Sequence, residues 1–426
     1  MNPNWRASPS SISGLTLSTL AASAQHVHAA GDDLLRVGLV GCGGRGSGAA
    51  AQALKADKNV KLTAMADAFA DRLESSLTNL QADGEISPKI DVPAERRFVG
   101  FDAYKQLLES GVDVVLLCSP PHFRPLHLQA AIAAGKHVFA EKPVAIDGPG
   151  VRSVLATCDV AKNKKLSVCS GLCLRYSQGF RAAIGRIHDG AIGDILTLQA
   201  NDLRGPIWTK PRQKEWTDME WQMRNWYYFT WLSGDFNVEQ HVHFLDVCAW
   251  VMGEKYPDSA SGSGGRQVRT GPEFGNIFDH HAVNYEYADG PSMLSQTRQQ
   301  SGCSGDMSVQ VVGSKGHATI SESKLAITPH DRGQSPWRYR SPDNDIYQTE
   351  HDDLFASIRK AEPINHGGYM ARSTLLAILG RMATYTGQTL TWQQALDSQE
   401  RLGPEQYAWG PLATPTIAVP GVTAYR

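Results

Sequence analysis

The sequence lacks the cysteine pattern of a disulfide-bonded or zinc-binding protein. Its seven cysteines are an odd number, lie scattered between positions 42 and 303, and include no Cys-x-x-Cys pair. Disulfide frameworks and structural zinc sites both depend on paired, regularly spaced cysteines. We therefore expect free and mostly buried thiols.

Long apolar runs and an excess of either charge are also missing. No apolar segment approaches the roughly 20 residues that a membrane-spanning helix needs, so no transmembrane segment is predicted. The 41 basic residues nearly balance the 43 acidic ones, which gives no electrostatic reason to expect nucleic acid as a partner. A chain of 426 residues that is 42% hydrophobic and 20% charged predicts a globular protein of more than one domain that binds small molecules.

Residues 1–33 differ in composition from the rest of the chain. They are rich in small and apolar residues, contain a single basic residue near the start, Arg6, and include Ala22-Ser23-Ala24, which has the pattern of a signal-peptide cleavage site. Two interpretations stay open, an export signal with a weak basic end and a leader of no targeting value. The location is therefore also open, between the cytoplasm and export to the periplasm in folded form.

The first part of the folded chain has the order strand, glycine-rich turn, helix, strand. The apolar run at 34–40 precedes Gly41, Gly43 and Gly46, which have the Gly-x-Gly-x-x-Gly spacing. Small residues permit a tight turn and let backbone N–H groups approach a pyrophosphate at the positive end of the following helix. This unit predicts a dinucleotide-binding site.

The second strand of the unit ends in an acid, Asp67, 26 residues after Gly41. A carboxylate in this position accepts hydrogen bonds from the 2′-hydroxyl of the adenosine ribose. It also repels the 2′-phosphate of NADP. The predicted cofactor is therefore NAD.

Strands and helices continue to alternate up to residue 170. Helices are expected at 101–111 and 125–135, and strands at 112–119 and 136–141. Strands joined through helices form a parallel, doubly wound sheet, whose ligand site lies at the carboxyl ends of the strands. Ser119 and Glu141 stand at two such ends.

From residue 171 onward the pattern changes to longer alternating segments. They lie at 194–205, 280–289, 293–300 and 306–322, and helices are expected at 349–363 and 371–387. Alternation of period two predicts a large, mostly antiparallel open sheet. We therefore predict an α/β fold, with an NAD-binding Rossmann domain at 34–170 and a domain for substrate binding and oligomer contacts at 171–426.

A charged pair followed by proline, Glu141-Lys142-Pro143, ends the strand predicted at 136–141. A lysine at this edge of the sheet faces the cofactor crevice, where it can donate to a substrate oxygen and stabilise developing alkoxide charge. Pro143 fixes the direction in which the chain leaves the strand. The alternative is a surface salt bridge at a strand end.

The segment 234–253 holds a second group of candidate residues. Read as one helix, it places Glu239, His243, Asp246 and Trp250 on one face, with an acid about one turn to either side of the histidine. A carboxylate that holds one imidazole nitrogen leaves the other free to take a hydroxyl proton. A purely structural histidine is the alternative.

A metal site is another interpretation of these histidines. Possible ligands are His241, His243, Asp246, His280 and His281. Side chains two positions apart on a helix diverge by about 200°, however, and do not share an ion. No metal is predicted.

Residues 206–231 contain five of the ten tryptophans and precede the histidine segment. Aromatic faces pack against the C–H faces of sugar rings, which makes this segment, with Trp226, a candidate for substrate binding. Aromatic residues that only stabilise a loop are an equal alternative.

Together these motifs resemble the glucose-fructose oxidoreductase and inositol dehydrogenase (Gfo/Idh/MocA) family. The resemblance rests on VGLVGCGGRG, on CSPPHFRPLHLQAAIAAGKHVFAEKPVA, on GLCLRYSQGF and on the histidine segment, and it covers about residues 34–400. It implies an N-terminal NAD(P)-binding domain, a C-terminal α/β domain whose open sheet serves oligomer contacts, and oxidation or reduction of sugars and cyclitols.

The resemblance also implies roles for individual residues. The adenosine diphosphate half of the cofactor is expected at Gly41, Cys42, Gly43, Gly44, Arg45, Gly46 and Asp67, and the nicotinamide half at Ser119, Pro120, His122 and His127. Glu141 and Lys142 are expected to reach cofactor and substrate, and Arg175, Trp226, His241 and His243 to contact the substrate.

The sequence departs from the family pattern at one point. The family pattern is Asp-x-Gly-x-His-x-x-Asp. Here Glu239 replaces its first Asp and His241 replaces its Gly, while His243 and Asp246 match. The departure concerns pocket size and substrate identity more than chemistry. The leader resembles those of members that are exported by twin-arginine transport, but it has no Arg-Arg pair.

We therefore predict an NAD-dependent oxidoreductase that acts on a secondary hydroxyl of a sugar, glycoside or cyclitol. Lys142 polarises the substrate oxygen, and His243, supported by Glu239 or Asp246, takes the proton. One alternative is a glycoside hydrolase or lyase that keeps NAD bound and works through a transient keto-sugar. Another is a non-catalytic NAD-binding sensor, against which Lys142 and His243 count.

A homo-oligomer, a dimer or tetramer, is also expected. The open sheet predicted within residues 190–325 would otherwise expose an apolar face to solvent.

Overall fold

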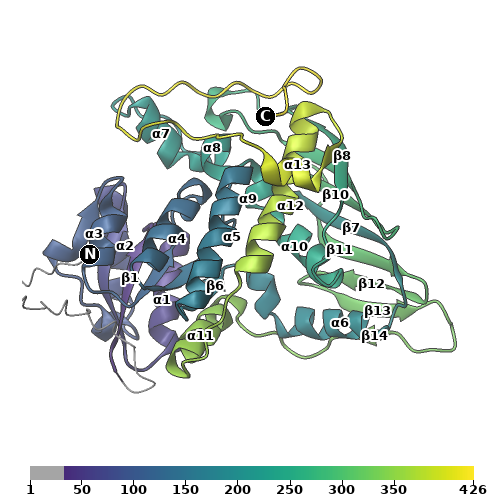
Figure 1. Ribbon diagram of the computed structural model, residues 1–426, viewed down its shortest axis with the longest axis horizontal. Coiled ribbons are helices and arrows are strands. Elements are labelled where there is room, and N and C mark those ends of the chain that lie inside the picture. Colours follow the sequence, from purple (N-terminus) through teal and green to yellow (C-terminus); the bar gives the residue numbers. More distant parts are fainter. Residues whose placement is uncertain (1–32) are drawn as a thin grey trace, which may run out of the picture.

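The computed structural model describes residues 33–426 and contains two sheets (Figure 1). The predicted leader lies almost wholly outside the described residues. The first sheet has six parallel strands in the order β3-β2-β1-β4-β5-β6. These strands are β1 (Leu35–Val40), β2 (Val60–Asp67), β3 (Arg97–Val99), β4 (Val114–Leu117), β5 (His137–Ala140) and β6 (Val168–Ser170).

The helices between these strands confirm the predicted doubly wound Rossmann architecture. They are α1 (Gly44–Ala56), α2 (Ala70–Ala82), α3 (Ala103–Glu109), α4 (Arg124–Ala133) and α5 (Gly148–Asn163). The central strand β4 is apolar throughout and fully buried, as expected for a parallel strand that is covered on both faces. The strand order reverses between β1 and β4, so a ligand crevice is expected at their carboxyl ends.

The second sheet has nine strands in the order β14-β13-β12-β11-β7-β10-β9-β8-β15. The strands are β7 (Ile195–Arg204), β8 (Ser259–Gly265), β9 (His280–Glu286), β10 (Ser292–Gln299), β11 (Asp306–Gly313), β12 (Gly316–Ile320), β13 (Leu325–Pro329), β14 (Trp337–Arg338) and β15 (Leu390–Thr391). Only β7 and β10 pair in parallel; the other neighbours are antiparallel. The predicted fold class is confirmed.

Helices cover one face of this large sheet (Figure 1). Val283 and Tyr285 are buried on the covered side. The other side carries polar side chains that bond to one another, such as Asn201 with Asp306 (2.7 Å) and Thr319 with Gln310 (2.8 Å). Leu294 and Val312 are exposed on the same side, so the outer face is mixed and more polar than expected. A homo-oligomer remains a prediction.

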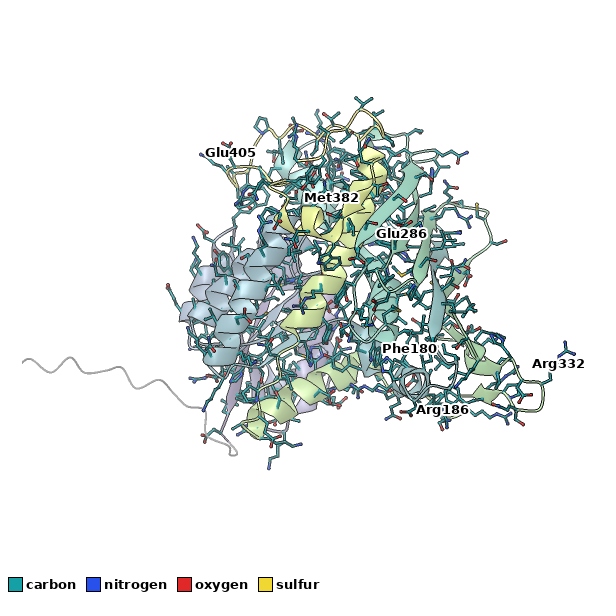
Figure 2. The ribbon with its side chains drawn as sticks, turned by 45° about the vertical axis from the view of Figure 1, so that its right-hand side comes forward. Phe180, Arg186, Glu286, Arg332, Met382 and Glu405 are labelled. Carbon is teal, nitrogen blue, oxygen red and sulfur yellow. The ribbon has the colours of Figure 1, made fainter. Side chains whose placement is uncertain are left out.

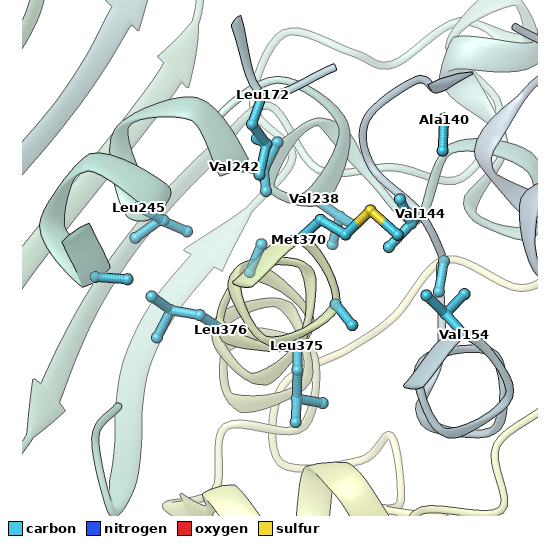
Figure 3. Close-up of a cluster of buried hydrophobic side chains, with 14 of the residues drawn as sticks. Ala140, Val144, Val154, Leu172, Val238, Val242, Leu245, Met370, Leu375 and Leu376 are labelled. Carbon is cyan, nitrogen blue, oxygen red and sulfur yellow. The ribbon is translucent and has the colours of Figure 1, made fainter. Parts of the chain in front are cut away.

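The long helix α12 (Gly367–Thr386) is almost wholly buried and joins the two halves of the molecule. Met370 of this helix packs between Val144, which follows β5, and Val238, which belongs to the second half (Figure 3). The close packing of an apolar core leaves little freedom for sliding. This cluster therefore holds the end of β5 at a defined position relative to the histidine segment.

Helix α11 (Ile346–Arg359), which we assigned to the second domain, packs against the first. The guanidinium of Arg359 pairs with Asp57 at 2.8 Å, and the amide of Gln348 donates to the carbonyl of Gln52 in α1. The boundary at residue 170 directly follows β6, and the division into domains stays a prediction.

The remaining helices belong to the second half of the chain. They are α6 (Gln178–His188), α7 (Asp218–Arg224), α8 (Thr230–Ser233), α9 (Phe236–Glu239), α10 (Val242–Val251) and α13 (Trp392–Asp397). Figure 2 shows Arg332 projecting from the loop beyond β13, far from Met382 in α12. Among the described residues, no helix combines the length and the apolar character needed to span a bilayer.

Candidate active site

The three motif glycines have different physical requirements. Gly41 has a φ of +95°, a conformation that favours glycine, and a Cβ atom at Gly46 would overlap the carbonyl oxygen of Gly41. A Cβ at Gly43 or Gly44 would meet no described atom within 4 Å. The first and third glycines are therefore needed for packing, and the second leaves open space at the start of α1. This arrangement fits a pyrophosphate at the helix N-terminus.

Asp67 ties the end of β2 to the glycine loop. Its Oδ2 accepts a hydrogen bond from the N–H of Cys42 (2.6 Å), and its Oδ1 accepts one from the N–H of Phe69 (2.9 Å). Burial raises the pKa of Asp67 above its ordinary value. Each carboxylate oxygen has a second lone pair, so the group can still accept a ribose hydroxyl.

A cavity of about 460 Å³ extends from the glycine loop across the carboxyl edge of the sheet. Its lining from the Rossmann side includes Gly41, Gly43, Gly44, Arg45, Gly46, Asp67, Phe69, Arg72, Phe101, Tyr104, Ser119, Pro120, Phe123 and His127. Its lining from the second half consists of Trp208, Lys210, Met223, Arg224 and Trp226. Trp226, expected at the substrate, thus lies beside the cleft that also contains the glycine loop.

The two histidines expected near the nicotinamide have different surroundings. Nδ1 of His127 lies 3.2 Å from the hydroxyl of Ser119, and burial lowers the pKa of His127 to about 3, so that it is neutral. Nε2 of His122 lies 2.7 Å from the hydroxyl of Tyr407, near the C-terminus. His122 is not among the described residues that line the cavity.

Lys142 is the second residue after β5, and its side chain is only 14% exposed. Its Nζ donates to Oε1 of Glu239 (2.9 Å) and to the carbonyl oxygen of the same residue (2.8 Å). An ammonium group has three donors. The third therefore remains for a substrate oxygen.

The predicted single helix over 234–253 is wrong, because the structure has two helices, α9 and α10, with a break at Gln240 and His241. At the break the N–H of His241 donates to Phe236, five residues earlier. A widened turn of this kind changes which side chains share a face. The regular spacing of four residues therefore does not bring Glu239 and His243 together.

His243 is half-buried, and its Nδ1 has no hydrogen-bond partner within the described part of the chain. Burial lowers the pKa of His243 well below its ordinary value, and the nearby positive charges of Lys142 and Arg204 add to the effect. The imidazole is therefore neutral, and one of its ring nitrogens carries a lone pair. The expected support by Glu239 or Asp246 is absent from the hydrogen bonds of the described residues.

Asp246 instead binds Arg175. The guanidinium donates through Nε and a terminal nitrogen to both carboxylate oxygens (2.8 and 2.7 Å), and its other terminal nitrogen donates to Glu254 (2.7 Å). The hydroxyl of Ser373 also donates to Asp246 (2.7 Å). These bonds use three of the five N–H groups of Arg175, and its expected contact with the substrate stays a prediction. Both residues connect structural elements.

His241 was also expected to contact the substrate, but it is fully buried. Its Nε2 lies 2.7 Å from the hydroxyl of Ser295 in β10, and burial lowers its pKa to about 3. His281 lies between Asp235 and Thr384. Within the described residues, no group of three or more histidine, cysteine or acidic side chains has the geometry of a metal site.

Arg45, in the first turn of α1, forms an ion pair with Glu141, which directly follows β5. Nε of Arg45 lies 2.7 Å from Oε1 of Glu141, and a terminal nitrogen lies 3.8 Å from Glu350 in α11. Burial raises the pKa of Glu350 well above its ordinary value, and the negative charge of Glu141 adds to this. The ring of Tyr347 lies below the guanidinium at 4.8 Å.

Sequence reasoning missed several of these residues. Phe69 and Arg72 lie two and five residues after Asp67, so their nearness to the motif could have indicated them. Tyr347 and Glu350 lie some 300 residues from Arg45 in the sequence, and no local pattern connects them.

A parallel sheet with a glycine loop, an acid at the end of β2 and an open cleft at its carboxyl edge define an oxidoreductase with an NAD-binding Rossmann fold. Family models bear this out: the model described as "Oxidoreductase family, NAD-binding Rossmann fold" matches residues 35–170, and the model of the family's C-terminal alpha/beta domain matches residues 184–371. The chain belongs to this family, the Gfo/Idh/MocA oxidoreductases.

Individual relatives are distant. The chain is 22% identical to an inositol 2-dehydrogenase of Rhizobium meliloti over 325 residues, which cover 76% of this chain and 86% of the relative. It is 28% identical to a 2,7-anhydro-N-acetylneuraminate hydratase of Escherichia coli over 182 residues, 42% of this chain and 44% of the relative. Among solved structures, an aldose-aldose oxidoreductase from Caulobacter crescentus superposes with a TM-score of 0.66 at 17% identity, covering 84% of this chain and 99% of that one.

Proposed function

We propose that the protein uses NAD to oxidise or reduce a secondary alcohol of a sugar, glycoside or cyclitol. The observation that carries the proposal is the pair formed by Lys142 and Glu239, which stands at the carboxyl end of β5 with His243 nearby. The family supplies the reaction type. The inositol and aldose substrates in the names of the relatives support the substrate class.

The residues of the cleft would divide the work as follows. Gly43, Gly44 and Asp67 would hold the adenosine diphosphate half of NAD, and Ser119 and Pro120 would contact the nicotinamide half. Bound NAD supplies a hydride acceptor at the edge of the sheet.

Lys142 would donate its third N–H to the substrate oxygen, which orients the alcohol and stabilises negative charge on that oxygen. Glu239 would keep the ammonium in place through its carboxylate and its carbonyl. The neutral imidazole of His243 would take the hydroxyl proton at a ring nitrogen.

A direct test is to incubate the purified protein with NAD and a panel of cyclitols, aldoses and aryl glycosides. The proposal predicts growth of the absorbance band of reduced nicotinamide with at least one cyclitol or sugar. Release of the aryl group without net reduction of NAD would contradict it and favour the alternative.

That alternative, a lyase or hydrolase that returns the hydride within one turnover, has one specific observation in its favour. One relative is named as a hydratase, a reaction without net redox change. Transient oxidation acidifies the C–H next to the carbonyl, so the same lysine and histidine would serve it. If the protein binds NAD but converts none of these substrates, the result would instead support the third hypothesis, a non-catalytic NAD-binding sensor.

A further inference from the structure

The C-terminal segment packs against residues on both walls of the dinucleotide cleft. We call residues 402–412 the strap; it belongs to the tail that runs along the top of the molecule over α7 and α8 (Figure 1). Figure 2 shows Glu405 of the strap at the outer edge of the molecule. No strap residue is among the described residues that line the cavity.

The strap rests on rings of the Rossmann wall that line the cleft. The ring of Trp409 lies 4.5 Å from that of Phe101 and 5.2 Å from that of Phe69, centroid to centroid. The ring of Tyr407 lies 5.5 Å from that of Phe123, and its hydroxyl bonds to His122 (2.7 Å). Aromatic pairs at such distances are favourable beyond the area they bury.

The same strap is bonded to α7, on the opposite wall. The N–H of Met219 donates to the carbonyl of Gly410 (3.1 Å), and the amide of Gln222 donates to the carbonyl of Leu412 (2.9 Å). The N–H of Leu412 donates to Asp218 (3.2 Å). The strap thus joins two walls that belong to different halves of the molecule.

A second connection lies beside it. Both terminal nitrogens of Arg224, in α7, donate to the two carboxylate oxygens of Asp71, in α2, at 2.9 Å. The guanidinium also lies 4.1 Å from the centroid of the Phe69 ring. Arg224 and Phe69 both line the cleft, so this contact closes it at the end where the adenosine would lie.

We propose that the strap and the pair formed by Arg224 and Asp71 act as a latch that keeps NAD in the cleft between turnovers. Because the strap packs on rings that line the cavity but does not itself line it, it controls opening without contacting the dinucleotide. Exchange of the cofactor then requires the latch to open, and a reaction that needs free NAD in every turnover is limited by that step.

The mechanism has a distinctive kinetic signature. If NADH enters and leaves only through an open state, a weaker latch raises the association and dissociation rates together and leaves the dissociation constant nearly unchanged. A residue that contacts the ligand directly would change mainly the dissociation rate.

The test uses full-length protein and NADH. Association is followed by NADH fluorescence after mixing, and dissociation by chasing bound NADH with excess NAD. Trp409→Ala and Asp71→Asn change residues outside the described lining of the cavity, and both are expected to raise the two rates by roughly tenfold. Val422→Ala is the matched control, because Val422 lies in the same tail and is 79% exposed; it should leave both rates unchanged.

Tyr407→Phe provides a variant that keeps the ring and removes only the hydroxyl bonded to His122, so that folding is preserved. It should raise both rates by about two- to tenfold. A rise in the dissociation rate alone, or rates equal to those of the parent in all three variants, would overturn the latch. If the parent binds NADH but exchanges it rapidly, the latch proposal fails and the proposed function stands. If the parent binds no NADH, both proposals fail.

Discussion

The ammonium nitrogen of Lys142 lies 2.9 Å from Oε1 of Glu239 and 2.8 Å from the carbonyl oxygen of the same residue. The two residues are 97 positions apart and come from different halves of the molecule. The acid that spacing alone assigned to His243 therefore belongs to the lysine. This contact joins the end of β5 to the end of α9.

Replacing Lys142 by Met should lower turnover by roughly 10²–10⁴-fold, the range for a positioned proton donor or acceptor. Glu239→Gln should lower turnover less, because the amide keeps one hydrogen bond to the ammonium. Neither change should alter the affinity for NADH, measured by fluorescence titration. Lys255→Met is a suitable control, because that ammonium pairs with Asp289 on the surface. An active Lys142→Met enzyme would exclude the assigned role.

His243→Asn keeps a polar side chain but removes the proton acceptor. Turnover should fall by roughly 10²–10⁴-fold, while NADH binding and the melting temperature stay close to those of the parent. Asp246→Asn should act differently, because Asp246 binds Arg175 and not the imidazole. It should lower the melting temperature more than it lowers turnover per folded molecule. Equal activity of His243→Asn and the parent would return the histidine to a structural role.

Two glycine variants separate cofactor binding from folding. A Cβ at Gly43 meets no described atom within 4 Å, so Gly43→Ala should leave the unfolding midpoint of the cofactor-free protein unchanged and weaken NADH binding by crowding the pyrophosphate. A Cβ at Gly46 overlaps the Gly41 carbonyl, so Gly46→Ala should destabilise the fold by about 1–3 kcal/mol. Urea unfolding and NADH titration of both variants check this. The opposite pattern would show that the loop does not cradle the cofactor in this way.

Asp67 should select NAD over NADP. Repulsion of the 2′-phosphate and loss of the ribose hydrogen bond together give a preference of about 1–3 kcal/mol. Asp67→Asn should reduce the preference because the charge is removed. Titration of parent and variant with NADH and NADPH measures both affinities. A parent that binds NADPH more tightly contradicts the assignment.

His351 should make the fold sensitive to acid. It is fully buried against Phe139, and burial lowers its pKa from 6.5 to about 3. The unfolded chain therefore binds a proton at higher pH than the folded one, so this contribution to stability is present above pH 6.5 and is lost as the pH falls toward 3. Relative to His351→Gln, the parent should lose about 1.4 kcal/mol of unfolding free energy per pH unit in that window. A difference that does not change with pH in urea titrations would refute this.

Local spacing was sufficient for the first half of the fold. The separations between Gly41, Gly43, Gly46 and Asp67 are set by one turn, one helix and one strand, and those elements follow from periodicity and glycine content. Lys142 could be placed at the edge of the sheet for the same reason. In these cases the function depends on residues that are neighbours along the chain.

The histidine segment shows where such reasoning ends. At the widened turn the side chain of His241 is buried against Ser295 in β10, and nothing in the spacing of residues 234–253 indicates this contact. The two acids of this segment also have partners from other parts of the chain: Glu239 pairs with Lys142, and Asp246 pairs with Arg175.

The sequence by itself therefore determined the class of fold, the binding of a dinucleotide and the position of Lys142 at the edge of the sheet, because each depends on the geometry of a single short segment. Only the tertiary structure decided that Glu239 pairs with Lys142 and Asp246 with Arg175, that α11 packs on the first domain, and that Tyr407 and Trp409 pack on rings of the cleft wall. Those contacts join residues from distant parts of the chain, and their pairing is determined by how the whole core packs and by no local periodicity.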